Sequence, residues 1–140
     1  MGRRPETGRG KDYLAIVLDS EGLSKAARGQ RQVAVALAAA VAAAVPVVVS
    51  AITLTEVLRG RRRDAAVHLL LKAFRVEPVS EELGRAAGEL LGRTGRRDTV
   101  DAVVVATAAS LHRPVRILTS DPGDIEALAE DLDDIQVVPV

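Results

Sequence analysis

The chain contains no cysteine, and this absence removes several kinds of chemistry at once. Disulfide bonds, thiolate nucleophiles and cysteine-ligated zinc are all excluded. The two histidines are too few for a histidine-rich metal site. One tyrosine, one phenylalanine and no tryptophan disfavour the aromatic platforms on which single-stranded nucleic acids stack. The core must therefore consist of valine, leucine, isoleucine and alanine.

The chain also lacks net charge, because 19 basic side chains balance 19 acidic ones. The charges are unevenly distributed: residues 1–63 hold eleven basic and five acidic side chains, whereas residues 121–140 hold seven acidic and no basic ones. A basic half could face a polyanion. Sixteen of the 19 basic residues are arginine, which suits bidentate phosphate contacts, although biased codon usage would give the same excess.

No signal peptide is expected, because the first residues are polar and rich in glycine and arginine. We expect residues 1–12 to form a flexible tail. The uncharged stretch 33–52 is formally long enough to span a bilayer, but alanine dominates it and Pro46 interrupts it. A helix, a break and a buried strand fit this stretch better, which predicts a cytoplasmic protein without a membrane span.

Apolar runs alternate with helical patterns from residue 13 to residue 140, which is typical of a single α/β domain. Strands are predicted at 13–18, 47–52, 74–79, 114–119 and 135–138. Helices are predicted at 23–45 with a possible break at Gly29, from Thr53 or Thr55 through the arginines 59 and 61–63, at 64–72, from Ser80 to 92–95, at 98–111, and before the last strand. The expected fold is a three-layer α/β/α domain with a central parallel sheet of four to five strands.

Acidic residues follow the predicted strands, at the edge where α/β sheets bind their ligands. Asp19 and Asp121 come directly after the first and fourth strands, and Glu56 is expected in the first turns of the helix after the second. Asp98 and Asp101 lie three residues apart at a helix start, so they share one face. These acids are therefore expected to meet at one edge of the sheet.

Carboxylates that meet in this way need compensation. Two unit charges about 4 Å apart repel by about 4 kcal/mol even at an effective dielectric constant near 20. They must protonate or hold a cation, although Arg59 and Arg97 could neutralise part of the charge. Oxygen ligands without cysteine or histidine point to Mg²⁺ or Mn²⁺.

Four segments resemble, in order and spacing, the motif blocks of the PIN domain: IVLDSEGL, VVVSAITLTEVLRG, DTVDAVVVATAA and ILTSDPGDIEAL. More narrowly, they are similar to the VapC-type ribonuclease toxins of toxin–antitoxin pairs. The resemblance covers nearly the whole chain beyond the tail. It implies an endoribonuclease toxin of a type II system that depends on Mg²⁺ or Mn²⁺. Such toxins cut RNA, are usually homodimeric, and are silenced by a cognate antitoxin.

The resemblance also carries over particular residues. The positions of the acidic quartet, which would bind the metal and act in catalysis, are Asp19, Glu56, Asp101 and Asp121. Asp98 would be a fifth acid at the edge of the site, and Asp124 matches a position that is often acidic. Thr119 or Ser120 would support the site through a hydroxyl, and Arg59 and Arg97 are candidates for contacts with RNA phosphates. Many relatives have an aromatic residue where this chain reads GDI, a departure that affects packing more than chemistry.

Simpler roles compete for several of these residues. Asp98 is well placed as a helix N-cap, and Asp101 could be the reciprocal acid of a capping box. Glu56 could be an ordinary first-turn glutamate that the helix dipole favours. The arginines 59 and 61–63 could line a track that binds phosphates, or they could form a solvated helix face. The alanine-rich helix could be core or a self-association face.

Two other functions compete with the nuclease. A non-catalytic PIN-like module could bind RNA or protein without cutting, although all four acidic positions are filled. A phosphoacceptor receiver domain would need a lysine after a later strand, and no lysine occurs beyond Lys72.

Overall fold

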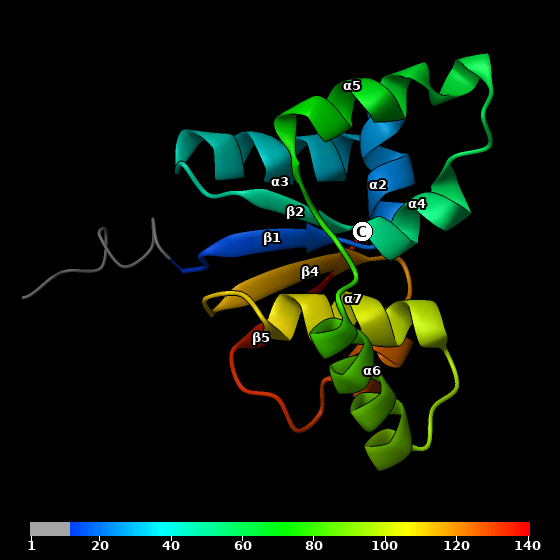
Figure 1. Cartoon of the computed structure of the whole chain (residues 1–140). Helices are drawn as coiled ribbons and strands as arrows, with labels where there is room; N and C mark the ends of the chain where they lie inside the picture. Colours follow the sequence, from blue (N-terminus) through cyan, green and yellow to red (C-terminus); the bar gives the residue numbers. More distant parts are fainter. Residues whose placement is uncertain (1–11) are drawn as a thin grey trace, which may run out of the picture.

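The computed structural model describes residues 12–140, in which five parallel strands lie between two layers of helices (Figure 1). The tail predicted over residues 1–12 lies outside the described residues, apart from Asp12. The sheet order is β3-β2-β1-β4-β5. Its strands are β1 (Ala15–Leu18), β2 (Val47–Ser50), β3 (Arg75–Glu77), β4 (Val115–Thr119) and β5 (Ile135–Pro139). The predicted three-layer α/β/α fold with a parallel sheet is therefore confirmed, with five strands.

The helices connect consecutive strands and cover both faces of the sheet. They are α2 (Ser20–Ala27), α3 (Arg31–Ala42), α4 (Ala51–Val57), the 3₁₀ turn η1 (Arg62–Asp64), α5 (Ala65–Ala73), α6 (Glu81–Thr94), α7 (Thr99–Ala109) and α8 (Pro122–Leu128). Figure 1 shows α2, α3 and α5 on one side of the sheet and α6 and α7 on the other. Within residues 12–140, no helix has the length and hydrophobicity that crossing a membrane requires.

The central strand β1 is buried on both faces, as its uninterrupted apolar sequence predicts. Ile16 and Leu18 pack in the cluster that includes residues of α2 and α3, whereas Ala15 and Val17 pack in the cluster of α6, α7 and α8. This alternation follows from the two-residue period of a strand. Asp19 is the next residue, so the buried strand fixes its position at the sheet edge.

The segment after β2 differs from the prediction. Helix α4 begins at Ala51, because the side chain of Ser50 rather than that of Thr53 or Thr55 accepts a hydrogen bond from a backbone N–H, that of Ile52 (3.3 Å). It ends at Val57, so the prediction that the arginines 59 and 61–63 continue the helix is wrong. Glu56 consequently lies in the last turn of α4 and not in its first turns.

Two further expectations concern the helices before and after this segment. The predicted helix 23–45 is divided into α2 and α3 at Gly29, whose φ of 72° breaks the helix. Only one face of the alanine-rich α3 is core. Val33 and Ala40 are buried, whereas Val35 and Val41 are exposed.

The ambiguous segment 98–111 forms helix α7 and not a strand. Seven consecutive residues, Ala102–Ala108, are buried, so the helix is apolar all round. Burial between the sheet and α6 outweighs the small cost of placing valine in a helix. Asp98 is the N-cap, as predicted.

The first turn of α2 packs tightly against β4 at Gly22. A Cβ atom at this position would lie 2.8 Å from the carbonyl oxygen of Leu118 and 3.3 Å from Oδ1 of Asp19. We expect Gly22→Ala to lower the free energy of unfolding by about 1–3 kcal/mol, because the helix must move away from the sheet. Urea denaturation would measure this loss.

Gly88→Ala in α6 is the matched control, since nothing lies within 4 Å of the added Cβ. It should raise the free energy of unfolding by about 0.5–1 kcal/mol through helix propensity alone. Equal effects of the two substitutions would contradict tight packing at Gly22.

Candidate metal centre

Asp19 marks the centre of the sheet edge at which β1 and β4 end. Its backbone N–H donates to the carbonyl of Leu118 in β4 (3.3 Å), which ties the two strand ends together. Its side chain is buried and caps α2 by accepting a hydrogen bond from the N–H of Gly22 (2.7 Å). Burial raises the pKa of Asp19, and hydrogen bonds from Thr119 and Gly22 oppose this rise.

Thr119 connects the acid after β1 with the acid after β4. Its buried hydroxyl accepts a hydrogen bond from the backbone N–H of Asp121 (2.9 Å) and is also hydrogen-bonded to Asp19. Of the two hydroxyls that the sequence suggested as supports, that of Thr119 therefore contacts the acids. Ser120 is exposed.

Glu56 reaches the same edge from the last turn of α4. Its Oε1 accepts a hydrogen bond of 2.5 Å from the hydroxyl of Ser20, the residue that follows Asp19. The charge of Glu56 also contributes to the raised pKa of Asp19, so the two acids are close enough to interact. The sequence reasoning missed Ser20, although a hydroxyl directly after a strand-ending acid was a usable signal.

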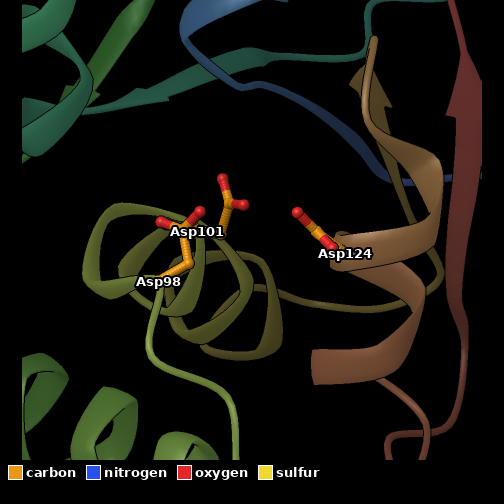
Figure 2. A group of neighbouring side chains, drawn as sticks. All are labelled: Asp98, Asp101 and Asp124. Carbon is orange, nitrogen blue, oxygen red and sulfur yellow. The ribbon is translucent and has the colours of Figure 1, made fainter.

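Three other acids form a tight group between α7 and α8. Ligand atoms of Asp98, Asp101 and Asp124 all lie within 4.8 Å of one another. Figure 2 shows Asp98 and Asp101 on the first turn of α7 and Asp124 pointing toward them from α8. Oδ1 of Asp98 accepts a hydrogen bond from the N–H of Asp101 (3.2 Å), as an N-cap does.

The acids of the two groups interact electrostatically. The pKa of Asp101 is raised to about 7, chiefly by burial, then by hydrogen bonding and repulsion from Asp98, and further by the charges of Asp19 and Asp121. The pKa of Asp121 is also raised, mainly by its hydrogen bond with Asp124. All six predicted acids therefore belong to one negatively charged site, although only Asp98, Asp101 and Asp124 form its tightest group.

One arginine partly neutralises this site, and it is not one of the two that the sequence suggested for this purpose. Arg96 forms an ion pair with Asp124 and is about one-third exposed. Arg97 is exposed and forms no ion pair within residues 12–140. The guanidinium of Arg59 donates instead to the carbonyls of Thr55 (3.0 Å) and Leu58 (2.8 Å).

The donor set fits a hard divalent cation. Carboxylate oxygens from three side chains converge within 4.8 Å, and neither cysteine nor histidine belongs to the group. One basic side chain cannot balance so many acids, and repulsion between neighbouring carboxylates contributes to the raised pKa values of Asp101 and Asp121. Asp98, Asp101 and Asp124 could hold Mg²⁺ or Mn²⁺ together, and the charges of Asp19 and Asp121 also act on Asp101.

Comparisons with known proteins agree with this geometry. The PIN domain family profile matches residues 16–139. No curated protein matches the chain. Among solved structures, VapBC2 from Rickettsia felis, bound to a promoter DNA fragment, is similar with a TM-score of 0.69 and 13% identity, covering 90% of this chain and 98% of that chain.

Two further structures have higher sequence identity. A toxin–antitoxin complex from Klebsiella pneumoniae is similar with a TM-score of 0.65 and 22% identity, covering 86% of this chain and 94% of that chain. VapBC-5 from Mycobacterium tuberculosis, a member of the VapBC family of toxin–antitoxin systems, is similar with a TM-score of 0.58 and 22% identity, covering 91% and 99%. At these identities the likeness establishes the shared fold.

The raised pKa of Asp101 predicts how the stability of the metal-free protein depends on pH. The folded state binds a proton more tightly than the unfolded state, whose carboxyl has a pKa near 3.8. Stability should therefore be highest below pH 4 for this group and decrease as the pH rises to about 7. Asp19 and Asp121 add contributions of the same sign.

Asp101→Asn should remove most of this dependence. Because the site is partly open to solvent, we expect it to stabilise the metal-free protein at pH 8 by only about 1–2 kcal/mol. Thermal unfolding in the presence of a chelator, from pH 4 to pH 8, would measure the effect. A substitution that destabilises the protein equally at both ends of this range would contradict it.

Proposed function

Because the chain belongs to the PIN domain family, we propose that it is a metal-dependent endoribonuclease that acts as the toxin of a type II toxin–antitoxin pair. The single observation that supports this proposal best is the convergence of Asp98, Asp101 and Asp124 within 4.8 Å at the carboxyl edge of the sheet. The fold shared with VapBC and other toxin–antitoxin structures supports the toxin assignment.

We assign the catalytic and metal-binding roles to the quartet Asp19, Glu56, Asp101 and Asp121, with Asp98 and Asp124 as additional ligands. A bound divalent ion would polarise the scissile phosphate and lower the pKa of water at neutral pH. Asp101 has a pKa near neutrality, so without a cation it would hold a proton on a substantial fraction of molecules. Loading the site then requires Asp101 to release this proton, which makes cation binding weaker at low pH.

The remaining predicted partners belong to the same proposal. A cognate antitoxin would silence the enzyme, and a second copy of the chain would complete a homodimer. Arg59 and Arg97 stay proposed contacts for RNA phosphates, and the cytoplasmic location stays a prediction. A PIN-like module that binds RNA or protein without cutting is the alternative, and it predicts binding without cleavage.

Removal of single acids tests the catalytic role. We expect Asp19→Asn and Asp101→Asn each to lower the rate of RNA cleavage at least about 100-fold in Mg²⁺ or Mn²⁺, because each removes a negative charge that holds the cation. A chelator should abolish cleavage by the unmodified protein. Gel analysis of a structured RNA would follow the reaction.

Asp131→Asn is the matched control, since Asp131 is exposed and pairs with Arg93 outside the acidic site. It should leave cleavage unchanged. Cleavage that neither the chelator nor the two site substitutions affect would refute the metal-dependent mechanism. RNA that is bound but never cut would favour the non-catalytic module.

Ser20 is expected to position Glu56. Removing its hydroxyl by Ser20→Ala should weaken the affinity for Mn²⁺ by about 10–100-fold, the range typical of residues that orient metal ligands. Isothermal titration calorimetry would measure this affinity independently of cleavage. Ser20→Thr keeps a hydroxyl and should retain most of the affinity; a loss equal to that of Ser20→Ala would argue against the hydrogen bond.

A further inference from the structure

The segment between α4 and α5 carries the densest positive charge of the described chain. Four of the five residues 59–63 are arginine, and all four are exposed. No ion pair within residues 12–140 involves any of them. We name residues 58–64 the arginine loop.

The only acid of the arginine loop is Asp64, and its carboxylate is hydrogen-bonded to the loop backbone. Oδ2 of Asp64 accepts hydrogen bonds from three consecutive backbone N–H groups, those of Arg59 (2.8 Å), Gly60 (2.8 Å) and Arg61 (3.2 Å). Asp64 is buried, with 4% of its surface exposed. These donors lower its pKa, so the carboxylate stays ionised while it folds the loop around itself.

This arrangement leaves the guanidinium groups of Arg61, Arg62 and Arg63 available to an external anion. If Asp64 accepted a hydrogen bond from one of these guanidinium groups, that arginine would be paired and less able to bind an external anion. Asp64 instead fixes the backbone, with Gly60 in the left-handed region at φ 70°. Nη1 of Arg59 donates hydrogen bonds to the carbonyl of Thr55 in α4 and to that of Leu58, so Arg59 anchors the loop to the helix that bears Glu56.

The loop lies on the same side of the molecule as the acidic site. Arg61 follows Glu56 by five residues, so its Cα lies within about 18 Å of that of Glu56 even if the chain is fully extended. Figure 1 shows the connection from α4 to α5 on the side toward which the strands point. A polyanion whose backbone entered the acidic site could therefore extend along the loop.

We infer that the arginine loop is a preorganised binding element for the phosphates of RNA, with Asp64 as its positioning residue and Arg61, Arg62 and Arg63 as the contacts. The inference rests on the proposed function for the choice of RNA as the polyanion. The planar guanidinium makes paired hydrogen bonds with phosphate oxygens. A loop that is already ordered loses little conformational entropy when it binds.

The first test removes the contacts. Binding of a fluorescent single-stranded RNA oligonucleotide would be followed by fluorescence anisotropy with a chelator present, so that the RNA stays intact. The triple variant R61A/R62A/R63A should bind at least about tenfold more weakly, and the slope of log affinity against log salt should decrease by about 2, that is, about 0.7 for each lost phosphate contact.

A charge-matched control distinguishes this loop from net charge. Arg28, Arg75 and Arg85 are exposed and pair with Glu21, Glu77 and Glu81, respectively. R28A/R75A/R85A changes the net charge equally and should retain most of the affinity and of the salt slope. Equal losses in the two triple variants, or no loss in R61A/R62A/R63A, would overturn the inference.

The second test separates preorganisation from charge. Asp64→Ala and Asp64→Asn both make the chain more positive by one charge, but only asparagine keeps an oxygen that can accept from the loop backbone. We expect Asp64→Ala to bind RNA at least about threefold more weakly than the unmodified protein despite its added positive charge, and Asp64→Asn to bind better than Asp64→Ala. Circular dichroism would verify that both variants fold. If Asp64→Ala binds as tightly as the unmodified protein or more tightly, Asp64 does not position the loop.

The binding experiments can refute the role of the arginine loop without refuting the proposed nuclease activity, and the reverse is also true. Binding is measured without metal, whereas the nuclease proposal depends on cleavage by the acidic site. Loss of RNA affinity in R61A/R62A/R63A together with no cleavage by the unmodified protein would support the loop and refute the nuclease. Metal-dependent cleavage by the unmodified protein, together with unchanged RNA affinity in R61A/R62A/R63A, would support the nuclease and refute the role of the loop.

Discussion

Repulsion among the carboxylates at one edge of a parallel sheet is the constraint on which the site depends. Leu18 pairs in register with Val49 of β2 and Leu118 of β4, so these three strands end together. Any acid placed after them must lie near the others. About 4 kcal/mol for each pair at close range is comparable to a large part of the stability of a small domain. The fold can therefore carry these acids only if hydrogen bonds, protons or cations compensate them.

The structure shows several partial compensations. Asp19 accepts the N–H of Gly22 and hydrogen-bonds Thr119, Glu56 accepts from Ser20, and Asp124 pairs with Arg96. Asp101 has no such donor among the described residues, and its pKa rises to about 7. A divalent cation would supply the positive charge that this geometry lacks. Under the proposed function, the repulsion that lowers stability would also favour binding of the metal.

The sequence predicted the features that depend on local pattern. Apolar runs located all five strands, and the Asp98-x-x-Asp101 spacing located the start of α7 despite its valines. The position of Asp19 and Asp121 at one edge followed from parallel topology alone. The role of Ser20, the pairing of Arg96 with Asp124 and the N-cap of α4 at Ser50 were missed. Each depends on which of several equivalent polar side chains reaches a particular N–H or carboxylate. Tertiary packing decides which side chain does so, and the spacing of residues along the chain does not predict it.

Asp64 and Asp101 differ in the number of backbone N–H groups that donate hydrogen bonds to their carboxylates. Three backbone N–H groups serve one oxygen of Asp64 and lower its pKa, so this buried carboxylate needs no cation. Asp101 lies in a more open position, accepts no backbone N–H among the described residues, and has a raised pKa. Asp64 exposes less of its surface than Asp101 does, yet its pKa is the one that falls. Backbone donors therefore lower the pKa of the acid that organises the loop, whereas burial and the neighbouring carboxylates raise the pKa of Asp101, which accepts no such donor among the described residues.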